Sequence, residues 1–94
     1  MGLTDEQLNK LCEYASALLP PGEIAILLGI PPEERKEFAV RCRTREGDPV
    51  YEAFHLGRLT TKLELRTNII KLAKAGSPAA EPLAEKFLRE QNLD

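Results

Sequence analysis

Five basic side chains lie within a short stretch of this chain, between Pro31 and Arg45, and they could bind a charged ligand. They are Arg35, Lys36, Arg41, Arg43 and Arg45. Guanidinium and ammonium groups donate charge-assisted hydrogen bonds to phosphate oxygens, so this segment predicts contact with the phosphates of double-stranded DNA. The whole chain has a formal net charge of −2, which confines any basic surface to this local region. A simpler alternative is a solvated helix end, where bases favour the negative end of the helix dipole.

Residues for catalysis or metal binding do not form a matching pattern. The chain has one histidine, His55, and two cysteines, Cys12 and Cys42, which are too far apart in sequence for a metal-binding pair. No phosphate-binding loop and no nucleophile arranged with a base is present. We therefore expect no catalytic residue, no metal and no cofactor. The protein is predicted not to be an enzyme, and His55 is expected to be a half-buried structural side chain.

Length and composition favour one small helical domain. The chain has 94 residues, of which 43% are hydrophobic and only 5% aromatic, so its core must consist mainly of Leu, Ile and Ala. No apolar run approaches the roughly 20 residues that a membrane span requires. The first residues are acidic, unlike a signal peptide. The protein is therefore expected to be cytoplasmic, with reduced thiols and no membrane contact.

The elements that position the basic residues are predicted to be short helices. Thr4-Asp-Glu-Gln7 matches a capping box and predicts a first helix that ends at Pro20-Pro21-Gly22. A second helix, Glu23 to Leu28, ends at Gly29, which supplies the backbone angle of a tight turn. A third helix begins at Pro32 and turns Phe38, Ala39 and Cys42 inward. The order of short helix, glycine turn and new helix is typical of a helix-turn-helix.

The rest of the chain predicts a long helix from Pro49 to Ala75 and a last helix from Ala79 to Gln91. The long helix has two apolar faces, and one of them is expected to cover the N-terminal bundle. The first face contains Leu56, Leu59, Leu63, Ile70 and Ala73. The second face needs a partner, which is the last helix folded back, a second subunit, or both. This face and the last helix are therefore the candidate oligomer interface. Its residues are Leu65, Ile69, Leu72, Leu83 and Phe87.

The predicted fold is therefore all-α: a small helical bundle with an N-terminal helix-turn-helix, a long helix and a C-terminal helix. Residues 1–94 are expected to form a single domain. Within it, residues 1–45 form the helix-turn-helix-like bundle and residues 48–91 the candidate oligomerisation region.

This order of elements resembles a known family over roughly residues 22–88. A glycine-turn helix-turn-helix is followed by Ala53 and Gly57 at the start of a long helix, and then by Ile70-Lys-Leu-Ala-Lys-Ala-Gly76-Ser-Pro-Ala-Ala80. In this order and spacing the chain is similar to the small terminase subunits of tailed bacteriophages. The resemblance implies a non-enzymatic, ring-forming protein that recognises viral DNA and delivers it to a large motor subunit during DNA packaging.

Two functions remain open at the level of sequence. In one, an oligomer presents the five basic residues to DNA repeatedly, so that weak single contacts add up. In the other, the same bundle is a protein-interaction or assembly adaptor that does not bind DNA. A helix that begins with Glu33, Glu34 and Glu37 repels phosphate there, although Glu can accept a hydrogen bond from a cytosine amine.

Overall fold

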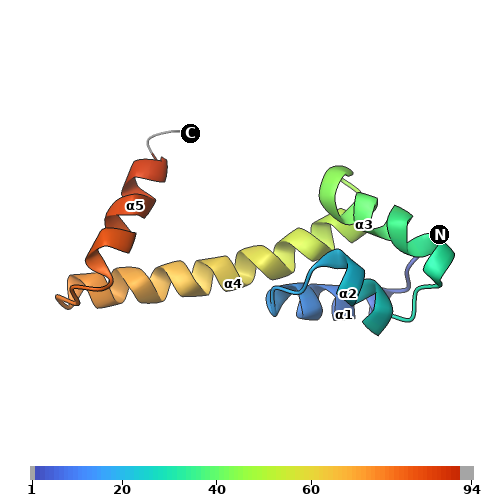
Figure 1. Cartoon of the computed structure of the whole chain (residues 1–94), viewed down its shortest axis with the longest axis horizontal. Coiled ribbons are helices and arrows are strands. Elements are labelled where there is room, and N and C mark those ends of the chain that lie inside the picture. The colour runs from blue at the N-terminus through green and yellow to red at the C-terminus, as the bar shows by residue number, and fades with distance from the viewer. Residues whose placement is uncertain (1, 92–94) are drawn as a thin grey trace. The chain divides into compact units, whose positions relative to one another are not determined.

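A computed structural model describes residues 2–91 of the chain, and all regular secondary structure in this range is helical. The elements are α1 (Asp5–Ser16), α2 (Pro21–Leu27), the 3₁₀ turn η1 (Pro32–Glu34), α3 (Arg35–Thr44), α4 (Pro49–Lys74) and α5 (Glu81–Gln91). Figure 1 labels the α-helices. The predicted all-α bundle is thereby confirmed. The chain divides into two compact units, Met1–Thr61 and Lys62–Asp94, with the boundary inside α4.

Helix α1 starts at the predicted capping box. The backbone N–H of Gln7 donates to Thr4 Oγ1 at 3.1 Å, and the N–H of Thr4 donates to Gln7 Oε1 at 2.9 Å. The helix ends at Ser16, earlier than the sequence predicts. The chain reverses at Leu18, whose φ of 65° is rare for a residue other than glycine. Leu18 therefore lies outside α1, and its side chain is exposed.

The turn between α2 and α3 follows the predicted pattern with two differences. Gly29 has the expected positive φ, 75°, and the N–H of Ile30 returns to Ala25 O at 3.0 Å, which closes the end of α2. Helix α2 begins at Pro21 and not at Glu23, because proline fits the first helical position, where no N–H is needed. The residues from Pro32 form a 3₁₀ turn, so α3 itself starts only at Arg35.

The core of the first unit joins α1, α2, α3 and the start of α4. Phe38 and Cys42 of α3 are fully buried, as the sequence predicts, and Ala39 is half-buried. They belong to a cluster formed by Leu11, Ala15, Ile24, Ala25, Ile30, Phe38, Cys42, Val50 and Phe54. This cluster fixes the orientation of α3 and thus decides which of its side chains face solvent.

Helix α4 packs on this core through a face that the sequence analysis did not predict. Leu56 and Leu59 were expected to cover the bundle, but they are 60% and 57% exposed. The packed face contains Val50, Phe54 and Gly57, all of them buried. Gly57 explains the difference: a Cβ there would lie 2.2 Å from Cys12 O, so only glycine allows the backbones of α1 and α4 to approach this closely.

The second unit contains the C-terminal half of α4, a turn at Gly76 and helix α5. Arg66 of α4 donates to Glu90 Oε2 at 2.7 Å, and its guanidinium lies 4.2 Å from the centre of the Phe87 ring. Within residues 62–91, Ala80 is the one buried side chain. This unit therefore has almost no core of its own. The last helix starts at Glu81, two residues after the predicted position.

Candidate nucleic-acid interface

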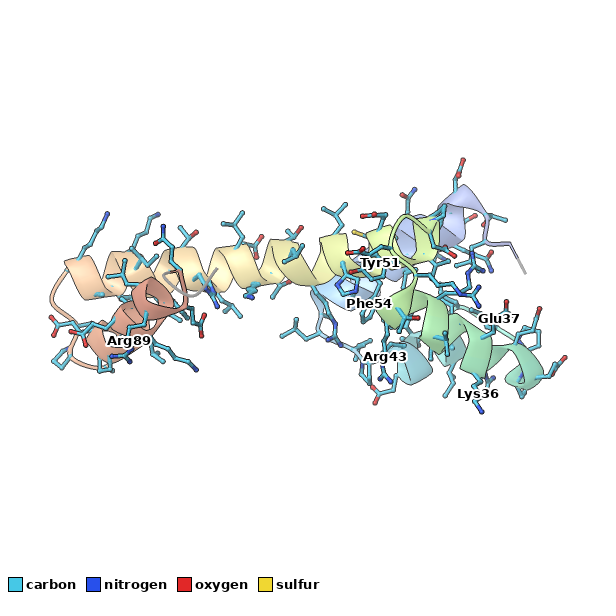
Figure 2. The ribbon with its side chains drawn as sticks, turned by 90° about the horizontal axis from the view of Figure 1, so that it is seen from above. Lys36, Glu37, Arg43, Tyr51, Phe54 and Arg89 are labelled. Carbon is cyan, nitrogen blue, oxygen red and sulfur yellow. The ribbon has the colours of Figure 1, made fainter. Side chains whose placement is uncertain are left out.

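The exposed side of α3 carries part of the predicted basic surface. Lys36 and Arg43 are exposed and lie two helical turns apart, so they project from the same side of the helix (Figure 2). Val40 lies between them and is 42% exposed. Arg45, also exposed, follows directly after the last turn of α3. A helix with two bases and one apolar side chain along its outer face can contact two phosphates and the base edges between them.

The other two predicted DNA-binding residues have structural partners within the chain. Arg35 is half-buried, and its Nε donates to Ile30 O at 2.9 Å, which connects the start of α3 to the turn. Arg41 forms a two-bond ion pair with Asp48: Nε donates to Oδ2 at 2.9 Å, and a terminal nitrogen donates to Oδ1 at 3.0 Å. The Arg41 and Asp48 side chains are only 12% and 16% exposed. The structure therefore brings Lys36, Arg43 and Arg45 to the surface and directs Arg41 inward.

Asp48 joins the end of α3 to the start of α4. Besides accepting from Arg41, its Oδ1 accepts from the backbone N–H of Val50 at 2.8 Å, and so caps α4. The hydrogen bond from Arg41 lowers the pKa of the Asp48 carboxyl and raises the pKa of the Arg41 guanidinium. One carboxylate thus fixes the corner beside the basic side of α3. No pattern in the sequence indicated that Asp48 would pair with Arg41.

Acidic side chains flank the same helix. Glu33 and Glu37 are exposed, whereas Glu34 is half-buried. Glu37 lies next to Lys36 in the sequence, but side chains of adjacent helical residues point in directions about 100° apart. Figure 2 shows Glu37 and Lys36 on different sides of α3. The basic side is therefore narrow, and carboxylates border it at the N-terminal end of α3.

His55 and the cysteines take structural positions. His55 is half-buried, its Nε2 lies 3.1 Å from Cys42 O, and its ring centre is 4.1 Å from that of Tyr51. Burial raises the pKa of the Cys42 thiol to about 12, so that thiol stays protonated and unreactive near neutral pH. Both cysteines are free thiols; Cys42 is buried and Cys12 is half-buried.

Arg58 was missed by the sequence analysis. Its terminal nitrogen donates to Leu19 O at 3.2 Å, and its guanidinium lies 4.6 Å from the centre of the Phe54 ring. The partner carbonyl is 39 residues away in the sequence, so no local pattern could have indicated this contact.

The residues of the predicted oligomer interface all lie in the second unit. Leu65, Leu72 and Leu83 are 52%, 54% and 44% exposed, and Ile69 and Phe87 are half-buried. Only Phe87 among them lines the groove between the C-terminal half of α4 and α5. The other four lie outside that groove.

The chain was compared with protein families, characterised proteins and solved structures. No protein family, characterised protein or solved structure matches the chain. Within residues 2–91, no group of three or more His, Cys, Asp or Glu side chains could hold a metal ion. In the same range, no helix combines the length and the apolar character needed to cross a membrane. The class that can be stated is an all-α protein with a helix-turn-helix arrangement in its first unit.

Proposed function

We propose that this is a non-enzymatic protein that binds double-stranded DNA through the outer side of α3 and acts as a homo-oligomer. One observation carries the proposal: α3 is held on a helical core through Phe38 and Cys42 while Lys36 and Arg43 remain exposed on one side. This is the arrangement by which a helix-turn-helix places its second helix in the major groove. Arg45 extends the basic side beyond the helix end.

The order of elements and their resemblance to small terminase subunits extend this proposal. In that role the protein recognises phage DNA for packaging and acts with a large terminase motor subunit. The oligomer adds avidity, which a surface with three exposed bases requires, because each phosphate contact contributes little by itself at physiological salt. The exposed apolar side chains of the second unit, including Leu65 and Leu72, favour self-association.

A titration of labelled duplex DNA, followed by fluorescence anisotropy at several salt concentrations, tests the DNA-binding proposal. The double variant Lys36→Glu with Arg43→Glu is expected to lower the affinity by at least about tenfold. Because two phosphate contacts are lost, the slope of log affinity against log salt should become shallower by about two. Arg41 is unsuitable for this test, since its replacement disrupts the ion pair with Asp48.

The control is the double variant Lys71→Glu with Arg89→Glu, which changes the net charge equally at two exposed positions of the second unit. This control should keep the affinity of the unaltered protein to within about twofold, because general charge acts weakly at physiological salt. Equal losses in the two double variants would contradict a site on α3. An absence of salt-sensitive binding by the unaltered protein would refute DNA binding as a whole.

The adaptor function remains the second candidate, because α2 has an apolar outer side. Ile26 and Leu27 are 59% and 55% exposed, and Leu18 nearby in the sequence is 52% exposed. Apolar groups of this size on a surface favour contact with another protein. Binding to a protein through this side would be nearly independent of salt, whereas phosphate binding would not. The DNA titration therefore separates the two functions: salt-sensitive binding supports DNA recognition, and no binding at low salt supports the adaptor.

A further inference from the structure

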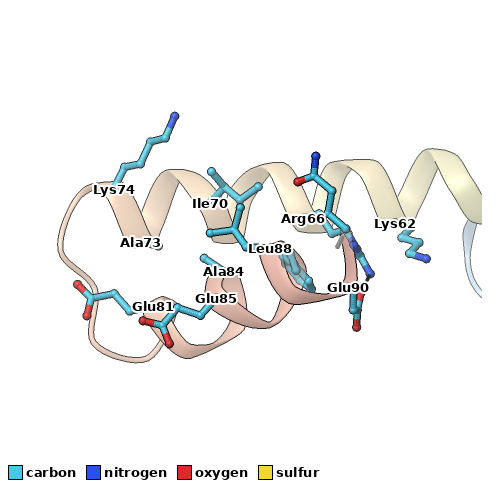
Figure 3. A pocket seen from close by; sticks show the side chains of 12 residues that line it. Lys62, Arg66, Ile70, Ala73, Lys74, Glu81, Ala84, Glu85, Leu88 and Glu90 are labelled. Atoms are coloured by element: carbon cyan, nitrogen blue, oxygen red, sulfur yellow. Dashed lines mark hydrogen bonds and ion pairs between the residues drawn. The ribbon is translucent and has the colours of Figure 1, made fainter. Parts of the chain in front are cut away.

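A groove of about 850 Å³ lies between the C-terminal half of α4 and α5, entirely within the second unit (Figure 3). Its apolar lining is formed by Ile70, Ala73, Ala84, Phe87 and Leu88. The charged residues that line it are divided by helix. Those on α4 are the bases Lys62, Arg66 and Lys74, and those on α5 are the acids Glu81, Glu85 and Glu90. The groove therefore has one basic edge and one acidic edge.

Only some of the charged side chains that line the groove form ion pairs within the part of the chain that the structure describes. Arg66 and Glu90 form an ion pair, and the hydrogen bond from Arg66 lowers the pKa of the Glu90 carboxyl. By contrast, Lys74, Glu81 and Glu85 have no ion pair or hydrogen bond from their side chains to another residue in the range 2–91. They lie near the turn that joins the two helices (Figure 3). These three charges are available to a partner.

The apolar lining also lacks a cover. Leu88 is 64% exposed and Ile70 is 39% exposed, although both line the groove. Within residues 62–91 Ala80 is the one buried side chain, so these two helices bury little apolar surface to offset the entropy cost of ordering the chain. A partner that covers the lining would supply the missing apolar burial. Such a partner must also place acidic groups against the basic edge on α4 and basic groups against the acidic edge on α5.

A second copy of this chain has that property, and we propose that two copies pair groove to groove about a two-fold axis parallel to the groove. Such an axis lays α4 of one copy over α5 of the other, so each basic edge meets an acidic edge. Lys74 and Glu81 lie toward the turn, whereas Lys62 and Glu90 lie toward the other end (Figure 3). Opposite charges therefore meet at matching levels. An axis across the groove would instead bring the two basic edges together, which repel.

Charge reversal followed by mixing of variants tests this pairing. Lys74→Glu alone places like charges at both symmetric positions of a homodimer, as does Glu81→Lys combined with Glu85→Lys. Each variant should raise the dimer dissociation constant by about tenfold or more, because every lost pair occurs twice. An equimolar mixture of the two variants should form heterodimers with nearly the affinity of the unaltered protein, because every contact in the mixed pair is again between opposite charges. Native mass spectrometry distinguishes the heterodimer from both homodimers.

Lys71→Glu is the control, because Lys71 is an exposed base of α4 that does not line the groove. It should leave the dissociation constant within about twofold. Circular dichroism of each variant establishes that the helices persist. If the charges only closed the hairpin within one chain, mixing would restore nothing. Variants that impair dimerisation without recovery in the mixture would therefore overturn the pairing.

This inference rests on the self-association in the proposed function and not on DNA binding. A dimer of the unaltered protein that none of these reversals weakens would overturn the groove pairing and leave the proposed oligomer intact. A protein that stays monomeric at every concentration in light scattering would overturn both. The DNA titration is a separate measurement, so its result stands in either case.

Discussion

Replacement of Gly57 by alanine is expected to destabilise the first unit, although alanine is the better helix former. The Cβ added at Gly57 would lie 2.2 Å from Cys12 O, 2.9 Å from Ala15 Cβ and 2.9 Å from Ser16 N. Two of these three atoms belong to the backbone of the α1 segment and cannot rotate away. The helices must therefore separate at their closest approach.

Two opposing effects set the magnitude of the change. Helix propensity favours alanine over glycine by about 1 kcal/mol. Forcing extra volume into a close-packed contact typically costs about 1–3 kcal/mol, and a clash with backbone lies at the upper end of that range. We therefore expect Gly57→Ala to lower the free energy of unfolding by about 2 kcal/mol. For a chain of this size, that corresponds to a fall in Tm of roughly 10 °C.

Gly22→Ala provides a matched comparison, because Gly22 also lies in a helix but a Cβ there meets nothing within 4 Å. That variant should be as stable as the unaltered protein or up to about 1 kcal/mol more stable. Urea denaturation followed by circular dichroism, at one fixed protein concentration, measures both changes. If Gly57→Ala were as stable as Gly22→Ala, the close crossing of α1 and α4 would be refuted.

Further predictions concern three residues of the first unit. Asp48→Ala should lower the free energy of unfolding at pH 7 by roughly 2–4 kcal/mol in urea denaturation, because the helix cap at Val50 and the two hydrogen bonds from Arg41 are lost. Folding lowers the pKa of Asp48, so the stability that its carboxylate contributes is present above the ordinary carboxyl pKa and is lost as the pH falls through the lower folded value. If the stability of Asp48→Ala and that of the unaltered protein fell equally in acid, this expectation would be contradicted. Folding raises the pKa of Cys42 to about 12, so stability should decline as the pH rises above the ordinary thiol pKa; a stability curve of Cys42→Ala with the same alkaline decline would argue against it. Leu18→Gly should raise Tm by a few degrees, because Leu18 has a φ of 65° and its exposed side chain contributes little burial; a lower Tm would show that this side chain matters more than its backbone strain.

Local signals in the sequence were sufficient to predict the helices of the first unit. The capping box at Thr4 and the turn glycine Gly29 depend on residues within one helical turn, and the structure contains both. The inward direction of Phe38 and Cys42 follows from helical periodicity alone, and both are buried. Boundaries were less accurate at prolines, since Pro21 and Pro32 fit the first turn of an α-helix and of a 3₁₀ helix equally well.

The packing of α4 could not be predicted in the same way. Leucine at helical spacing suggested that Leu56 and Leu59 face the core, but the closest approach occurs at the smallest residue, Gly57. Hydrophobic periodicity ranks faces by apolar character and takes no account of how closely two backbones can approach. The sequence also did not indicate which of the basic residues would be exposed. Arg41 is turned inward by its ion pair with Asp48, which lies on the other side of the α3–α4 loop.

The contacts at the end of α1 are expected to form late in the folding of the first unit. The last turn of α1 contains no basic residue, and carbonyls at and beyond its end accept hydrogen bonds from α4: Thr61 Oγ1 donates to Ser16 O, and Arg58 donates to Leu19 O. The partners are separated by 45 and 39 residues in the sequence. Contacts of such long range form after local helices because loop closure must come first. In pulsed hydrogen exchange during refolding, amides in the last turn of α1 should therefore gain protection together with those of α4, later than amides near the capping box.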